Sequence, residues 1–497
     1  MSNSNKQVNP RLEKLEKIIN SGQNPYPYRF SRSHDISEII DNSDKFIESE
    51  DEVRLAGRII AFRRQGKTVF CNLKQDSQKI QLYVSQKVIG EESYDLFKCL
   101  DLGDFIGIEG SVFLTRTNEL SINVKKFEIL CKSTRALPVP KEKIVDGEKQ
   151  IFDQFKNKEQ RYRQRYIDLI LNDSVMDTFK KRSLIVKTIR EYLENDSFLA
   201  VETPTLQKIY GGANAKPFET HHNSLDLKLY LRVSNELFLK RCIVGGMEKV
   251  YEIVKDFRNE GIDRTHNPEF SQVEFYQAYA DYKDMMVHFE NIYAKACIAV
   301  NGTTKINYQG VDLDLTPPWE RLTMKDAIKK YAGFDVDEKS DDEIVALLKA
   351  KDVELEGNYI RGLAVSELFE TYCEEFLVQP VFITDHPIES TPLCKVHRDN
   401  KTLVERFEPY INTWEIGNAY SELNDPVLQR KFFQDQVERG RGGEDETHPM
   451  DEDFLNAIEY GMPPTGGVGM GIDRMVMILT NQTTIRDVIL FPLMRDN

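Results

Sequence analysis

The sequence predicts an α+β protein in which a small N-terminal β-barrel precedes a larger domain of mixed helices and strands. Short runs of alternating apolar and polar residues fill positions 53–131, and a period of two is typical of strands with one buried face. Beyond a stretch with two prolines, helical periodicity and strand-like apolar runs alternate to the end of the chain. At 497 residues the chain is long enough for two or three domains, each with its own core.

The composition is that of an ordinary globular protein, with 40% hydrophobic and 30% charged residues. The seven cysteines include no CxxC pair, which argues against a disulfide framework and against a zinc site of the usual spacing. No apolar run approaches the ~20 residues that cross a bilayer, and no apolar stretch follows the N-terminus, so we expect a cytoplasmic protein without membrane contact. The net charge of −15 restricts any nucleic-acid contact to a local basic surface, because phosphate binding needs positive charge.

Residues 1–48 form an N-terminal segment in which we expect one short amphipathic helix. Over residues 11–20 the apolar side chains recur at helical spacing along one side: Leu12, Leu15, Ile18 and Ile19. A polar stretch follows. We interpret the helix as a surface element that covers the next domain.

Residues 49–133 are predicted to form the barrel. Turn residues such as Gly66 and Gly103 separate the short alternating runs. About five strands curled by glycines are typical of a small Greek-key barrel of the OB type. Such barrels bind single-stranded nucleic acid by stacking bases on exposed aromatic side chains. A barrel with a purely structural role is the alternative.

Residues 134–150, with Pro138 and Pro140, are polar and are interpreted as a linker between domains. Residues 151–497 form the larger domain. Helical spacing is clear over residues 178–193, and a helix-rich, charged insertion is expected at about 321–380.

Two arginine-centred motifs, far apart in the chain, are suited to ATP. A guanidinium offers a fork of donors to phosphate oxygens and can lie over an aromatic ring. The glycines of the second motif do not form a Walker loop or a Rossmann fingerprint, and are better explained by backbone that packs close to a ligand. The first motif is Phe257-Arg258-Asn259-Glu260 followed by His266-Asn267-Pro268-Glu269-Phe270, and the second is Gly469-Met470-Gly471-Ile472-Asp473-Arg474.

These motifs resemble motifs 2 and 3 of the class II aminoacyl-tRNA synthetases, and the surrounding sequence is similar to the lysyl-tRNA synthetase family from about residue 26 to the C-terminus. The resemblance implies an α+β fold with an N-terminal OB-fold β-barrel and a class II catalytic core, an antiparallel β-sheet flanked by helices. The segment Phe198-Leu199-Ala200-Val201-Glu202-Thr203-Pro204 resembles motif 1, which forms the subunit interface in that class. A homodimer is therefore expected.

By this resemblance, Arg258 holds the α-phosphate beside the substrate carboxylate and stabilises charge in the transition state. Arg474 reaches the terminal phosphates, and the adenine ring lies between Arg474 and Phe270. Arg258 and Arg474 are therefore the expected catalytic residues. The implied ATP-binding set is Arg258, Asn259, Glu260, His266, Asn267, Phe270, Glu408, Glu415, Ile416, Gly471, Ile472, Asp473 and Arg474.

Glu408 and Glu415 are the expected ligands of Mg²⁺. The segment that contains them alternates like a strand and is broken by a turn, so two antiparallel strands would place both carboxylates over one ATP. Magnesium usually binds one or two carboxylates together with substrate phosphates. The alternative is a pair of solvated surface glutamates.

A cluster of acidic residues is suited to an amino acid with a cationic side chain, because a buried cation needs paired carboxylates. The resemblance implies that Gly212 and Glu236 meet the α-amino group of lysine with Glu274 nearby, and that Asn418 meets its carboxylate. Tyr276 and Glu422 would meet the ε-ammonium, and Tyr420 would form a wall beside the aliphatic stem. Ser234-Asn235 stands where Ala-Pro is more usual. The expected lysine-binding set is Gly212, Glu236, Glu274, Tyr276, Asn418, Tyr420 and Glu422.

On the barrel, the positions that match the anticodon-reading set of the family are Arg63, Phe70, Gln81 and Glu119. Phe70 is expected to stack on a base, while Gln81 and Glu119 bond its Watson–Crick edge. The alternative for Phe70 is an ordinary core position.

The resemblance implies a lysine–tRNA ligase. Such an enzyme activates L-lysine with ATP and Mg²⁺ to lysyl-adenylate and pyrophosphate, then transfers lysine to the 3′-terminal adenosine of tRNA-Lys. Three alternatives remain open: an aspartyl- or asparaginyl-type enzyme, a lysine ligase that acts on a protein, and an inactive paralogue that binds RNA. The acidic cluster favours a cationic substrate, the barrel argues against the protein ligase, and the intact motifs argue against the inactive paralogue.

Overall fold

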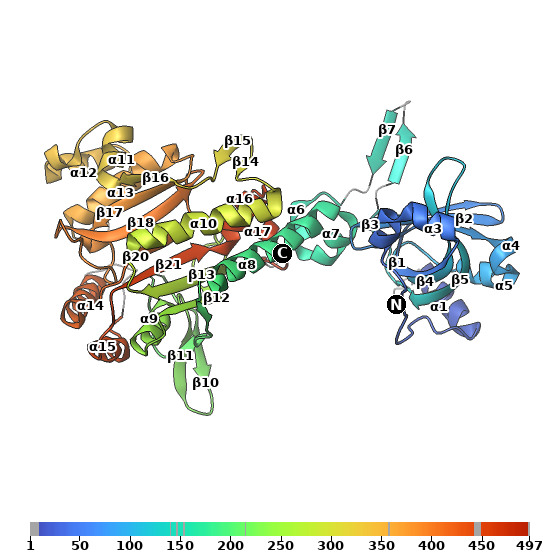
Figure 1. The fold of residues 1–497 in the computed structure, drawn as a ribbon, viewed down its shortest axis with the longest axis horizontal. Helices are drawn as coiled ribbons and strands as arrows, with labels where there is room; N and C mark the ends of the chain where they lie inside the picture. Colours follow the sequence, from blue (N-terminus) through green and yellow to red (C-terminus); the bar gives the residue numbers. More distant parts are fainter. Residues whose placement is uncertain are drawn as a thin grey trace, which may run out of the picture. The chain divides into compact units, whose positions relative to one another are not determined.

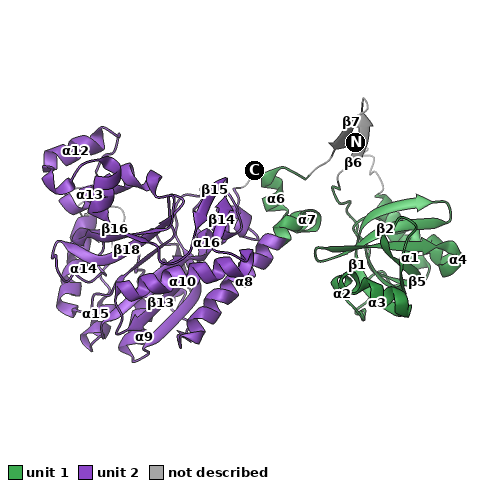
Figure 2. Ribbon diagram, turned by 45° about the horizontal axis from the view of Figure 1, so that its top comes forward, with its two compact units in different colours: residues 1–176 green, residues 177–497 purple. Residues whose placement is uncertain are grey.

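The computed structural model describes residues 9–139, 141–145, 148–152, 155–213, 215–355, 358–441 and 449–495. The chain divides into two compact units, residues 1–176 and 177–497 (Figures 1 and 2). Each unit has its own hydrophobic core.

Unit 1 begins with three short helices, where the sequence predicts only one. The predicted helix is α1, and the Asn9 side chain caps it by accepting a hydrogen bond from the Arg11 amide. The next two helices lie in the stretch interpreted as polar, and they bury Ile36, Ile39 and Phe46 in the barrel core. Three apolar residues dispersed among polar ones are too weak a pattern to predict such short helices. The helices are α1 (Pro10–Asn20), α2 (Ile36–Asp41) and α3 (Ser43–Ser49).

The predicted barrel is confirmed. Five strands of unit 1 close in the order β1-β2-β3-β5-β4, with β3 and β5 parallel and the other neighbours antiparallel. Alternate side chains, such as Leu82 and Val84, point into the core. The elements are β1 (Glu52–Gln65), β2 (Thr68–Gln75), β3 (Gln78–Ser85), α4 (Gln86–Ile89), α5 (Glu91–Phe97), β4 (Phe105–Leu114) and β5 (Leu120–Cys131).

A buried ion pair lies directly after β5, where the chain leaves the barrel. The Lys132 ammonium contacts Asp101 at 2.7 Å and Asp104 at 2.9 Å, and its side chain has no exposed surface. An antiparallel hairpin of β6 (Lys141–Val145) and β7 (Glu148–Phe152) overlaps residues 134–150, which were expected to form a linker, and extends two residues beyond them. Residues 140, 146 and 147 are outside the described part. Helices α6 (Lys158–Arg163) and α7 (Arg165–Leu171) follow.

Unit 2 is built on the expected sheet flanked by helices, with antiparallel pairing between its central strands. In the described part of the chain, nine strands join it in the order β16-β17-β18-β20-β21-β13-β12-β8, and β19 pairs with β18. The two outermost pairs, β12 with β8 and β16 with β17, are parallel. Parallel neighbours need long crossover connections, and helices supply them in both places. The strands are β8 (Leu199–Ala200), β12 (Lys249–Phe257), β13 (Glu269–Ala278), β16 (Glu320–Thr323), β17 (Val381–Pro387), β18 (Leu403–Ile411), β19 (Trp414–Glu415), β20 (Gly417–Ser421) and β21 (Thr465–Gly471).

Helices cover one face of this sheet (Figure 1). The long helix α8 (Asp173–Asn195), which includes the predicted 178–193, packs with α10 (Tyr282–Asn301) and α16 (Ile472–Leu479) against the strands in one core. Phe275 of β13 and Val468 of β21 are buried there. On the opposite face of these strands, Tyr276 of β13 is buried in a second core.

Two smaller groups of helices complete unit 2. Helices α9 (Glu236–Val244), α14 (Pro426–Arg441) and α15 (Glu452–Glu459) share a second core with β13. Helices α11 (Met324–Ala327), α12 (Asp341–Lys349) and α13 (Arg361–Cys373) lie between β16 and β17, where the helical insertion was expected, and form a third core. In the described residues, no helix is both long and apolar enough to span a membrane. The remaining elements are β9 (Leu206–Gln207), β10 (Glu219–His222), β11 (Leu227–Leu231), β14 (Lys305–Tyr308), β15 (Val311–Asp314) and α17 (Ile485–Val488).

Candidate active site

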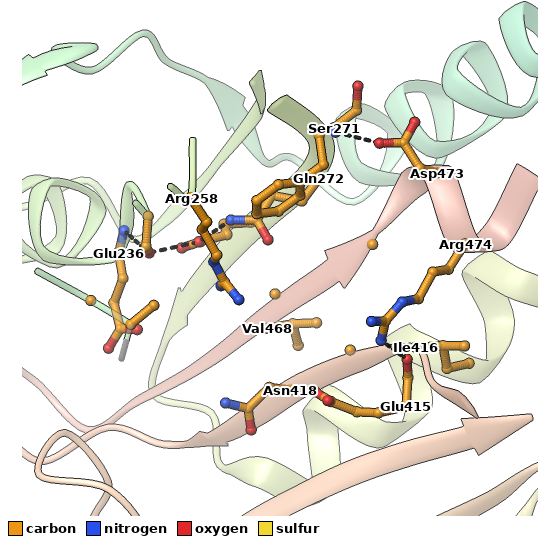
Figure 3. Close-up of a pocket in the computed structure, with 18 of the residues that line it drawn as sticks. Glu236, Arg258, Ser271, Gln272, Glu415, Ile416, Asn418, Val468, Asp473 and Arg474 are labelled. Carbon is orange, nitrogen blue, oxygen red and sulfur yellow. Dashed lines mark hydrogen bonds between the residues drawn. The ribbon is translucent and has the colours of Figure 1, made fainter. Parts of the chain in front are cut away.

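A cavity of about 390 Å³ opens on the face of the sheet opposite α8 and α10 (Figure 3). The period of two along β13 explains why: Val273 and Phe275 enter the helix-covered core, so Gln272, Glu274 and Tyr276 line the cavity. The two arginine-centred motifs, which the sequence separates by about two hundred residues, therefore meet at one place. β13, β20 and β21 form its floor.

A glycine of β21 allows side chains from neighbouring strands to pack against this floor. A Cβ on Gly467 would lie 2.1 Å from Glu422 Oε1 and 2.4 Å from Tyr276 Cε1, both closer than atoms can approach. A Cβ on Gly469, the next position on the same face, would meet nothing nearer than 3.7 Å. Gly467 is therefore required by a contact with specific side chains, whereas Gly469 is not.

Arg258, directly after β12, and Arg474, in α16, both line the cavity (Figure 3). The Arg258 guanidinium lies 5.1 Å from the centroid of the Phe270 ring, and its buried Nε has no hydrogen-bond partner among the described residues. Arg474 donates to the Glu415 carbonyl oxygen and contacts His266 Nε2 at 3.1 Å. Two arginines beside an aromatic ring can hold a polyanion and a flat base together.

Asp473 links α16, the helix that carries Arg474, to the sheet. It accepts from the Ser271 amide at 2.6 Å (Figure 3). It also accepts from Arg182 Nη1 at 2.6 Å. The helix that carries Arg474 is thereby tied to both α8 and β13.

Most residues of the expected ATP-binding set line the cavity, and three do not. Asn259 is exposed beside the cavity, and its backbone N–H donates to the Lys216 carbonyl oxygen at 2.7 Å. Ile472 is buried in the helix-covered core. Glu408 lies just behind the wall, where it accepts hydrogen bonds from Arg406 and from Tyr410, the latter at 3.0 Å. Those on the wall are Arg258, Glu260, His266, Asn267, Phe270, Glu415, Ile416, Gly471, Asp473 and Arg474.

The two expected magnesium ligands are neighbours on antiparallel strands, with Tyr410 of β18 opposite Glu415 of β19. Burial, followed by the charge of Glu408, raises the pKa of Glu415 to about 7. Burial also opposes ionisation of Glu408, but Arg406 and His386 lower its pKa below the usual value. The site thus holds negative charge that the protein does not fully balance.

That surplus charge fits a divalent cation. Burial, then Glu367 and Glu408, raise the pKa of Glu370 to about 8, so the acidic environment extends behind the pair. Within the described ranges, no group of three or more His, Cys, Asp or Glu side chains is arranged to hold a metal by itself. A pair of carboxylates completed by substrate phosphates is the usual arrangement for Mg²⁺.

The other end of the cavity is acidic and buried. Glu274 accepts from Ser234 Oγ at 2.9 Å, Gln272 Nε2 at 2.7 Å and the Tyr276 hydroxyl at 3.0 Å. The Tyr420 hydroxyl donates to Glu236 at 2.6 Å. Every member of the expected lysine-binding set lines this end: Gly212, Glu236, Glu274, Tyr276, Asn418, Tyr420 and Glu422.

The charges at this end are incompletely balanced. Burial, then Asp256 and Glu236, raise the pKa of Glu274 well above its usual value. Burial also raises the pKa of Glu422 although Lys240 opposes it. A cationic ligand would stabilise the ionised form of both carboxylates.

Sequence reasoning missed several residues that hold the pocket. Lys240 lies completely buried beneath it, 2.5 Å from Glu236 and in contact with Glu422. Arg406 donates from Nε to Asn418 Oδ1 at 2.9 Å, which leaves the amide group of Asn418 as a donor for a carboxylate. The spacing of four residues between Glu236 and Lys240 in an apolar helix could have indicated their ion pair. No feature of the sequence indicates the hydrogen bond between Arg406 and Asn418.

On the barrel of unit 1, the expected anticodon residues lie on neighbouring strands. Arg63 is opposite Phe70 in the β1–β2 register. Phe70 is half-buried, with its ring centroid 5.2 Å from that of Tyr83. Gln81 is buried and accepts from Ser121 Oγ at 3.2 Å, while Glu119 is exposed.

Comparison with known proteins adds family matches to this geometry. Residues 157–495 match the family described as tRNA synthetases class II (D, K and N), and residues 53–130 match the OB-fold nucleic acid binding domain. The chain is 49% identical to the lysine–tRNA ligase of Clostridium novyi (strain NT) over 98% of this chain and 94% of that protein. It is 48% identical to the lysine–tRNA ligase of Clostridium perfringens (strain SM101 / Type A), over 98% of this chain and 95% of the relative.

Proposed function

Because the chain belongs to the class II tRNA synthetases of the D, K and N group, we propose that it is a lysine–tRNA ligase. The observation that carries the proposal is the buried acidic end of the cavity, where Glu236, Glu274 and Glu422 surround space for a cationic side chain next to the two arginines. The relatives that match nearly the whole chain bear this activity in their names.

In the first reaction, the lysine carboxylate attacks the α-phosphorus of ATP and pyrophosphate leaves. No side chain needs to act as a nucleophile. Arg258 holds the attacking carboxylate beside the α-phosphate and stabilises the charge that develops there, and Asn418 donates to the same carboxylate. Arg474 holds the far end of the triphosphate, with Phe270 against the adenine ring. Glu260, exposed at the rim, accepts from the adenine amino group.

Glu408 and Glu415 would hold Mg²⁺, which neutralises phosphate charge when bound. Glu415 is the member on the cavity wall, whereas Glu408 does not line the cavity and accepts a hydrogen bond from Arg406. The raised pKa of Glu415, about 7, supports this assignment because a cation there would relieve the charge repulsion.

In the second reaction, a hydroxyl of the 3′-terminal adenosine of tRNA-Lys takes the lysyl group from the adenylate. Residues 151–497 form the catalytic domain of the proposal, residues 49–133 the anticodon-binding domain, and residues 134–150 the linker. Arg63, Phe70, Gln81 and Glu119 would contact the anticodon. The partly exposed Phe70 ring supports a stacking role.

The proposed enzyme is a cytoplasmic homodimer. The support for a dimer is at the edge of the sheet, where β8 pairs with β12 alone among the described strands. Leu199 on that strand is 53% exposed. An open strand edge with an exposed leucine is suited to a second subunit.

Amino-acid-dependent ATP–pyrophosphate exchange tests the proposal, with Mg²⁺ present and each standard amino acid supplied separately. Exchange with lysine alone is the expected result. Exchange with aspartate or asparagine would keep the class II chemistry and refute the pocket assignment. Absence of exchange with every amino acid, from a folded protein, would favour the inactive RNA-binding alternative.

A further inference from the structure

We propose that Lys240 is a positioning residue for the amino-acid substrate: it pairs with Glu236 and Glu422, and holds the Glu422 carboxylate against the cavity. The inference rests on the proposed function, because it concerns how the same pocket recognises lysine. Nothing in the first or second reaction requires Lys240 to touch a substrate.

The geometry places Lys240 between two carboxylates from distant parts of the chain. Its ammonium lies 2.5 Å from Glu236 Oε1, one turn earlier on α9, and contacts Glu422 Oε2 at the end of β20. The aliphatic stem and ammonium are enclosed, with the Tyr420 ring centroid 5.4 Å and the Phe454 ring centroid 6.0 Å from Nζ. The side chain has no exposed surface.

Lys240 engages only one oxygen of each carboxylate. Both Glu422 oxygens are buried without a hydrogen-bond partner among the described residues. Oε2 contacts the Lys240 ammonium as an ion pair, whereas Oε1 lies over Gly467 on the cavity floor. An unpartnered, buried carboxylate oxygen is costly unless a ligand completes it. The substrate ε-ammonium is a group of the right charge to do so.

Charge counting supports the same conclusion. Glu236, Glu274 and Glu422 bring three negative charges to the pocket when ionised, and Lys240 offsets one of them. Two negative charges remain, which matches the two ammonium groups of free lysine. A pocket with three uncompensated carboxylates would instead take up protons and lose its capacity to pair with ammonium groups.

The protonation of this pocket depends on all the groups that face it. Burial opposes the charge of Lys240, but Glu236 and Glu422 raise its pKa above the usual value. Glu274 and Asp256 face each other on one side, and the hydroxyls of Tyr276 and Tyr420 and the Cys394 thiol face the cluster on the others. Arg406 also faces Cys394. Lys240 is the lysine that contacts Glu236 and Glu422 in the described part of the chain.

The test compares Lys240→Met and Lys240→Gln in the full-length chain. Pyrophosphate exchange gives the KM for lysine and the KM for ATP separately, from about pH 6 to about pH 9. Both variants are expected to raise the KM for lysine roughly 10- to 100-fold near neutral pH, with the KM for ATP within about 2-fold, and the deficit should shrink as pH rises because the carboxylates then ionise without help. Lys249→Met is the matched control, because Lys249 pairs with Asp196 away from the cavity.

The results distinguish a failure of the role proposed for Lys240 from a failure of the proposed lysine–tRNA ligase function. Wild-type exchange with lysine together with an unchanged KM in both variants would overturn the role of Lys240 alone, whereas absence of wild-type exchange with lysine would overturn the proposed function. A normal KM in Lys240→Gln with a defective Lys240→Met would show that a polar filler suffices and would refute the need for charge. If Lys240→Met does not fold, Lys240→Met/Glu422→Gln should restore folding because it removes the unpaired carboxylate; a double variant that is equally unfolded would also refute the inference.

Discussion

Replacement of Gly467 by alanine should block lysine recognition while leaving ATP binding in place. The added Cβ would lie 2.1 Å from Glu422 Oε1 and 2.4 Å from Tyr276 Cε1. Neither group can stay where it is, because non-bonded heavy atoms do not approach so closely. Glu422 and Tyr276 are both assigned to the substrate ε-ammonium, so the methyl group disturbs that end of the pocket alone.

The size of the effect follows from what must move. Forcing a methyl group into a packed site costs about 1–3 kcal/mol of folding free energy. Displacing the carboxylate weakens one charged hydrogen bond to the substrate, worth about 1.5–3 kcal/mol, which corresponds to a rise of roughly 10- to 150-fold in the KM for lysine. The KM for ATP should change less than about 3-fold, because the arginines lie at the other end of the cavity.

Gly469→Ala is the matched control, since it lies on the same face of the same strand and its Cβ would meet nothing nearer than 3.7 Å. Urea unfolding should show the loss of free energy in Gly467→Ala and none in Gly469→Ala. Pyrophosphate exchange then gives the two KM values. An unaltered KM for lysine in Gly467→Ala would refute the placement of the ε-ammonium beside Glu422 and Tyr276.

Three further perturbations address the barrel, the metal pair and the stability of unit 1. Phe70→Ala should weaken tRNA charging by about 1–3 kcal/mol of stacking energy and leave pyrophosphate exchange unchanged; equal losses in both assays would contradict the anticodon assignment. Because the pKa of Glu415 is raised to about 7, its carboxylate is protonated below that pH and ionised above it, so the Mg²⁺ concentration for half-maximal exchange should fall as pH rises from about 6 to about 8. Glu415→Gln should remove that pH dependence, and a variant that retains it would exclude Glu415 as the titrating ligand. Lys132→Met should destabilise the barrel by about 3–5 kcal/mol in urea unfolding, because it leaves the buried carboxylate of Asp104 without its ammonium partner. Lys125→Met, at the exposed pair with Glu52, should leave the free energy of unfolding nearly unchanged.

The barrel was predictable because its information is local. Val53 and Leu55 are buried on either side of the exposed Arg54, and this period of two directly reports which side chains are buried. The short helices α2 and α3 were not predictable in the same way. Ile36 and Phe46 stabilise them only because the barrel core is there to receive these side chains.

The direction of the outer strand pairs could not be predicted either. The class resemblance implied an antiparallel sheet, whereas β8 with β12 and β16 with β17 are parallel. Strand direction at an edge depends on where a long connection returns the chain, and the pattern of apolar residues within a strand is the same for either direction.

By itself, the sequence determined which residues could carry the chemistry: Arg258, Arg474 and the pocket glutamates stand in motifs whose types and spacing suit ATP and a cationic amino acid. Only the tertiary structure determined the pKa shifts of these residues and the groups with which they pair. It buried Glu236 and Glu422 around Lys240, placed Glu408 behind Glu415 rather than beside it on the wall, and brought Gly467 under the Glu422 carboxylate. The physical reason is that burial and charge pairing arise between segments distant in sequence, and these long-range contacts exist only once the chain has folded.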